Sequence, residues 1–71
     1  MKINETIRNA LVLKYQGDIA AAKANIEIYL TNAVGIGEHP DLISAIDSEM
    51  DKAAEADDKL TFLENQIDWL A

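Results

Sequence analysis

The sequence predicts an all-α protein, an antiparallel two-helix hairpin of coiled-coil type that dimerises into a four-helix bundle. Two observations predict it. Apolar residues recur every three or four positions over two long segments, which is helical periodicity. One segment between them, Val34–Pro40, holds two of the three glycines and the only proline. The 71 residues allow one domain, residues 1–71.

The first helix is expected over about residues 4–33. Asn4 is a good N-cap, and Glu5 then lies in the first turn, where the helix dipole favours a negative charge. Gly35 can adopt the left-handed conformation that ends the helix. The expected apolar stripe consists of Ile7, Leu11, Tyr15, Ile19, Ala22, Ile26, Tyr29 or Leu30, and Ala33.

A loop over about residues 34–39 leads to a second helix, expected over about residues 40–70. Pro40 suits the first helical position, where its missing N–H costs nothing. The expected stripe consists of Ile43, Ile46, Met50, Ala53, Ala56, Leu60, Leu63, Ile67 and Leu70. We expect Trp69 to cover the open end of the hairpin near Ile3 or Ile7; the alternative is an exposed interface tryptophan.

The first helix carries more apolar surface than one neighbour can cover, which indicates a second contact. Its second face predicts self-association as a homodimer, with a higher oligomer or an obligate hetero-partner as alternatives. A glycine within a helix costs about 1 kcal/mol relative to alanine, and close helix packing would explain one at residue 17. A mild kink or an ordinary exposed glycine would explain it too. The predicted self-association residues are Leu13, Gly17, Ala20, Ala21, Ala24 and Ile28.

Charge is strongly segregated along the chain, whose formal net charge is -7. The first 35 residues contain four basic and three acidic side chains, whereas the last 36 contain two basic and ten acidic ones. This acidity argues against nucleic acid and anionic membrane as partners, and against an RNA-binding hairpin dimer of the Rop type. It fits either a solvated face or a decoy for a basic host protein. The candidate acidic face is Asp47, Asp51, Glu55 and Asp58.

Motifs for catalysis, cofactors or metals are not recognisable, so we expect a non-enzymatic protein without cofactors. There is no cysteine, no phosphate-binding loop and no zinc-ligand spacing. His39, the only histidine, is expected as a loop or capping residue; Ile36, Glu38 and His39 form a candidate partner-facing tip. The longest uncharged stretch, residues 28–37, is too short to span a bilayer. Without an export signal, a cytoplasmic location is expected.

Two stretches of the chain resemble a group of viral proteins. Residues 25–30, Asn-Ile-Glu-Ile-Tyr-Leu, and residues 34–42, Val-Gly-Ile-Gly-Glu-His-Pro-Asp-Leu, are similar to small uncharacterised proteins of marine tailed phages. The resemblance is especially to proteins of T4-like phages of cyanobacteria, and the acidic run over residues 45–60 fits the same pattern. The resemblance implies a phage-encoded role in the infected cell or the particle. It implies no activity, cofactor or catalytic residue.

Overall fold

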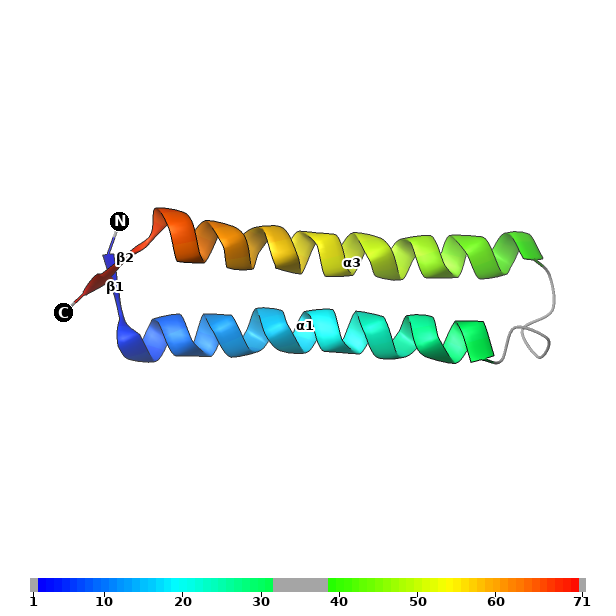
Figure 1. The fold of residues 1–71 in the computed structure, drawn as a ribbon, viewed down its shortest axis with the longest axis horizontal. Coiled ribbons are helices and arrows are strands. Elements are labelled where there is room, and N and C mark those ends of the chain that lie inside the picture. The colour runs from blue at the N-terminus through cyan, green and yellow to red at the C-terminus, as the bar shows by residue number, and fades with distance from the viewer. Residues whose placement is uncertain (1, 32–38, 71) are drawn as a thin grey trace.

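The computed structural model describes residues 2–31 and 39–70 of the chain. Two long helices, α1 (Glu5–Thr31) and α3 (His39–Gln66), lie side by side and run in opposite directions (Figure 1). Two short strands, β1 (Lys2–Asn4) and β2 (Asp68–Leu70), lie at the open end. The predicted antiparallel hairpin is therefore confirmed, while the expected loop and its glycine cap lie outside the described residues.

The first turn of α1 is capped as the sequence predicts. The Ile7 backbone N–H donates a hydrogen bond of 2.9 Å to the Asn4 side-chain oxygen, satisfying one of the free donors at the helix start. At the other end, the Thr31 hydroxyl donates to the Glu27 carbonyl at 2.9 Å. Each of these hydrogen bonds joins a side chain to the backbone of α1, from Asn4 just before the helix and from Thr31 at its end.

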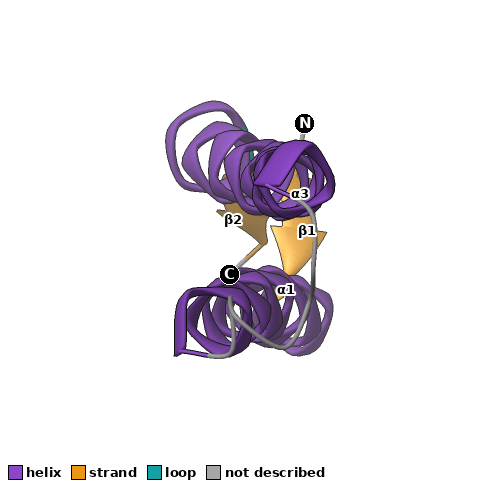
Figure 2. Cartoon of the chain, turned by 90° about the vertical axis from the view of Figure 1, so that its right-hand side faces the viewer, coloured by secondary structure: helices purple, strands orange, loops and turns teal. Residues whose placement is uncertain are grey.

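The C-terminal end of the second helix differs from the expectation. The helix ends at Gln66 instead of continuing to residue 70, and β2 pairs with β1 in parallel. Both strands cross the open end from the side of α3 towards α1, which explains a parallel pairing between the ends of an antiparallel hairpin (Figures 1 and 2). Ile3 pairs with Trp69 in this ribbon, so the expected proximity of these residues occurs as backbone pairing.

The facing sides of the two helices follow strict seven-residue repeats, as in a coiled coil. All residues of both seams are half-buried or buried. On α1 the seam is Arg8, Val12, Tyr15, Ile19, Ala22, Ile26 and Tyr29. On α3, continued one residue beyond the helix, it is Leu42, Ile46, Glu49, Ala53, Ala56, Leu60, Leu63 and Ile67.

Two residues of the predicted α3 stripe are wrong by one position, whereas Ile46 and Ala53 lie in the seam as predicted. Ile43 and Met50, expected in the seam, are 69% and 55% exposed, and Leu42 and Glu49 take their places. The repeat that passes through Leu63 and Ala56 reaches residues 49 and 42 when continued backwards by seven. A one-residue step turns a helix by 100°, so the apolar neighbours face outward.

On α1, the expected stripe residue Ile7 is exposed, and of the two alternatives Tyr29 and Leu30 it is Tyr29 that lies in the seam. Ile7 and Leu30 lie at opposite ends of the helix and are both more than a third accessible. The half-buried Arg8 and Tyr29 occupy the corresponding seam positions. The same 100° turn per residue places each apolar neighbour beside the seam.

The hairpin buries little for its size. Among the described residues, the buried hydrophobic side chains are Ala22, Ala56 and Leu63. The radius of gyration is 16.0 Å, against about 11 Å for a compact chain of this length. The accessible surface is 5240 Å², whereas a compact protein of 7.8 kDa exposes roughly 4,400 Å². Neither described helix is long and apolar enough to cross a membrane.

Candidate functional site

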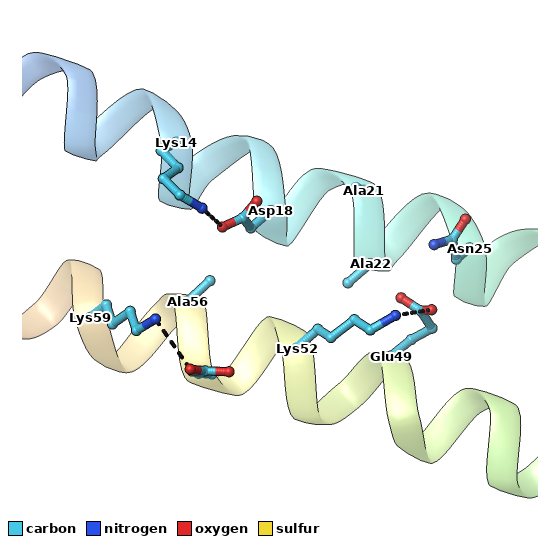
Figure 3. Close-up of a pocket in the computed structure, with 10 residues that line it drawn as sticks. Lys14, Asp18, Ala21, Ala22, Asn25, Glu49, Lys52, Ala56 and Lys59 are labelled. Carbon is cyan, nitrogen blue, oxygen red and sulfur yellow. Dashed lines mark hydrogen bonds and ion pairs between the residues drawn. The ribbon is translucent and has the colours of Figure 1, made fainter.

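A polar cleft of about 400 Å³ runs along one side of the hairpin, between the middle parts of α1 and α3. Small alanines on the facing helix sides leave this space open, and longer polar side chains surround it (Figure 3). Three of the six basic residues of the chain lie here, each close to an acidic one. The cleft is lined by Lys14, Asp18, Ala21, Ala22, Asn25, Glu49, Lys52, Glu55, Ala56 and Lys59.

Glu49 is the one buried charged residue in the described part of the chain, with 6% of its surface exposed. The Lys52 ammonium donates to Glu49 Oε1 at 3.1 Å, and Asn25 faces the carboxylate from α1 (Figure 3). Hydrogen bonding from the Asn25 side chain, and then from Lys52, lowers the pKa of Glu49 below its usual 4.5. Desolvation opposes this effect and is the smaller influence, because only two helices surround the group.

Two further ion pairs lie on the rim of the cleft, each within one helix. Lys14 donates to Asp18 at 2.9 Å on α1, and Lys59 lies 3.1 Å from Glu55 on α3. The hydrogen bond between Lys14 and Asp18 raises the pKa of Lys14, and the Coulombic attraction of the Asp18 carboxylate is the next largest cause. The ammonium groups of Lys14 and Lys59 each lie 6.0 Å from the centre of the Tyr15 ring, within cation–π range.

These two pKa shifts describe ion pairs. A general acid or base works best when its pKa lies near the working pH. The pKa of Glu49 moves down and that of Lys14 moves up, so both groups become more firmly charged at neutral pH. The three ion pairs each lie within one helix, and the hydrogen bond between Asn25 and Glu49 is the polar contact of the cleft that links α1 to α3.

An apolar groove of about 210 Å³ lies nearer the open end of the hairpin. Phe62 is 57% exposed at its edge, and Lys59 forms the boundary with the polar cleft. The remaining lining residues are the seam residues Tyr15, Leu63 and Ile67, together with the half-buried Leu11, which lies beside the seam of α1.

One face of α1, the side that carries Gly17, Ala24 and Ile28, points directly away from α3. A residue two positions further along a helix is turned by 200°, so Gly17, Ala24 and Ile28 lie opposite the seam residues Tyr15, Ala22 and Ile26. Every residue of this face is exposed. The face, called the outward face below, consists of Ala10, Leu13, Gly17, Ala20, Ala24 and Ile28.

The exposures on this outward face are high for large apolar residues. Leu13 is 68% exposed and Ile28 is 55% exposed. A Cβ atom built on Gly17 meets no other atom within 4 Å. Ala21, also predicted for self-association, is exposed but lines the polar cleft, so it lies at the edge of this face.

The acidic face lies on α3, and Glu55 at its edge also lines the polar cleft. Asp47, Asp51, Glu55 and Asp58 are all exposed on α3 at steps of four, four and three residues, which places them along one side of the helix. The described helices differ sharply in charge: α1 has three acidic and three basic residues, whereas α3 has eight acidic and two basic ones, a net charge of -6.

The remaining predicted residues and sites stand as follows. Ile36 and Glu38 lie outside the described residues, and His39 is described only as the first residue of α3. Within residues 2–31 and 39–70, no group of three or more His, Cys, Asp or Glu residues is arranged to hold a metal ion. The sequence reading missed Glu49 and its neighbour Asn25; the seven-residue repeat was the signal that could have found Glu49.

Comparison with models of protein families, with characterised proteins and with solved structures found no match to this chain. The functional interpretation therefore depends on the surfaces and charges described above.

Proposed function

We propose that this protein is a small non-enzymatic interaction module that self-associates through the outward face of α1. One observation carries the proposal: this face bears exposed Leu13 and Ile28, contains no charged residue and extends over most of the helix. Large exposed apolar patches on soluble proteins commonly mark interaction sites. The small core of a single hairpin also favours self-association, because chains of this size commonly gain stability by oligomerisation.

The pKa shifts in the polar cleft support the non-enzymatic part of the proposal. Both shifted groups, Glu49 and Lys14, are held in their charged forms by neighbours on the hairpin itself. Such shifts belong to structural ion pairs as well as to active sites, and here their direction fits ion pairs. The Asn25–Glu49 contact gives the cleft a structural role between α1 and α3, while its ion pairs each stabilise one helix.

Light scattering on size-exclusion eluate at two ionic strengths tests self-association. We expect a dimer at tens of micromolar, with twice the chain mass of 7.8 kDa, whose population changes little with salt. Apolar contacts cause this insensitivity, because salt screens exposed charges but not burial of apolar surface. A monodisperse monomer with cooperative unfolding at that concentration would contradict the proposal.

A matched pair of variants locates the contact. Ala20 and Ala54 are both exposed alanines in the middle of a helix, one on the outward face and the other on α3. Ala20→Lys places two like charges in the proposed contact and should give a monomer. Ala54→Lys changes charge and size equally but should leave the dimer unchanged. Equal effects of the two variants would exclude the outward face as the contact.

The resemblance to phage proteins suggests where such a module works. We propose a phage-encoded protein that acts in the cytoplasm of the infected bacterium or in the virus particle. Mass spectrometry of purified particles and of infected-cell extract distinguishes the two. Recovery from neither fraction during infection would refute this setting.

The acidic face favours a second candidate function, that of a decoy for a basic nucleic-acid-binding surface of a host protein. Four carboxylates along one helix side could occupy such a surface. The test is displacement of labelled duplex DNA from a purified DNA-binding domain at low and moderate salt. Neutralising the acidic face should abolish displacement. The control neutralises four exposed acids off that face: Asp41, Asp57, Glu64 and Asp68. Failure to displace DNA at low salt would exclude this function.

A further inference from the structure

We propose that the second copy docks on the outward face so that the four helices form a flat row, α3–α1–α1–α3, and not a closed square bundle. This inference rests on the self-association proposed above and specifies its geometry. In a square bundle each helix contacts two neighbours about 90° apart around its axis. In a row, each inner helix contacts its neighbours on opposite sides.

The distribution of side chains around α1 matches the row. The outward face lies opposite the seam, and the flanks between them carry charged and polar side chains, accompanied on the cleft side by Ala21 and Ile7. Lys14, Asp18 and Asn25 occupy the flank that lines the polar cleft, and the other flank carries Gln16 and Lys23. A square bundle would bury one of these flanks, which costs free energy because charged groups lose their water. A row buries uncharged surface.

Electrostatic repulsion between the two α3 helices also favours the row over the square bundle. Helix α1 has no net charge, whereas α3 has a net charge of -6 over its described length. With neighbouring helix axes 8–10 Å apart, the two α3 helices are separated by about 24–30 Å in a row and by about 8–14 Å in a square. The screening length at physiological salt is about 8 Å, so only the row removes most of their repulsion.

The area fits one added copy. The hairpin exposes 5240 Å², which is roughly 800 Å² more than a compact chain of its mass. A stable interface of standard size buries about 800 Å² on each side. The surplus of the whole chain is thus similar in size to one side of a standard interface, and docking on α1 leaves the acidic faces exposed at both edges of the row.

A distance between the two outer helices tests this geometry. The chain has no cysteine, so Ala54→Cys introduces a single attachment point for a spin label near the middle of α3, on an exposed site. Helix spacing plus the reach of two outward labels gives about 40 Å or more in a row, and about 30 Å or less in a square. Pulsed electron paramagnetic resonance measures this range.

The outcomes separate the geometry from the self-association beneath it. The labelled sample is first measured by light scattering, and a monomer there refutes self-association itself. A dimer with the short distance refutes only the row. Gln16→Lys provides a second check: residue 16 lies on a polar flank, so the dimer should persist in a row, whereas its loss would indicate that this flank is buried and contradict the proposal.

Discussion

Replacing Gly17 by alanine should stabilise the isolated hairpin. Gly17 lies in the middle of α1, and a Cβ atom there meets no atom within 4 Å. The only remaining effect on the single chain is helix propensity, which favours alanine by about 1 kcal/mol. Since a core of this size supplies no more than about 3–5 kcal/mol in total, the gain is a large fraction of stability. It corresponds to a rise in melting temperature of about 4–8 °C.

The assay is urea unfolding followed by circular dichroism, at a dilution where light scattering shows monomer. Ala54→Gly, the reverse change at an exposed position of α3, should cost about 1 kcal/mol and calibrates the measurement. If Gly17→Ala fails to stabilise the dilute monomer, the site is not open as described. If its gain stays constant as concentration rises, the added methyl group does not hinder α1–α1 packing, and close contact at residue 17 is refuted.

Three further tests of the fold use four variants. Leu63→Ala, at a buried seam position, should lower the free energy of unfolding by about 2–5 kcal/mol. Leu13→Ala, at an exposed site, should change the stability of the dilute monomer by under about 0.5 kcal/mol. Equal losses in the two variants would contradict the assigned seam. Asn4→Ala should remove about 1 kcal/mol by loss of the cap, and no loss would show that the cap is unimportant. The folded state lowers the pKa of Glu49, so its contribution is full above the unfolded value near 4.5 and is lost as pH falls through the folded value. Unfolding from pH 7 to 3 should therefore show the wild-type advantage over Glu49→Gln shrinking with acidity; a constant difference would refute the assignment.

Much of the hairpin could be predicted from local signals. Asn4 is the N-cap that its position suggested, and the second helix begins next to Pro40, as the sequence indicates. Two long periodic segments separated by one Gly-Pro segment left few arrangements other than a hairpin. These signals depend on neighbouring residues only, which is why sequence alone reveals them.

The seam and the polar cleft depend on contacts between the helices, and the sequence predicted most of the seam but not Arg8, Val12, Leu42, Glu49 or the cleft. Choosing the most apolar residue at each turn selects Met50, whereas the structure buries Glu49, whose charge is satisfied by Asn25 and Lys52. A buried carboxylate is favourable only with such neighbours, and Asn25 is distant in sequence. The predicted end of the second helix was wrong for a related reason, because β2 forms only where β1 lies beside it.

The parallel ribbon determines how the molecule responds to tension between its ends. Residue 2 starts β1 and residue 70 ends β2, so in a parallel pair they lie at opposite ends of the ribbon. A pull on both loads the inter-strand hydrogen bonds together in shear, whereas an antiparallel pair would open one bond at a time. The geometry therefore places this ribbon in the load path between residues 2 and 70, so that a pull on these residues strains the strand pairing before it separates the two helices.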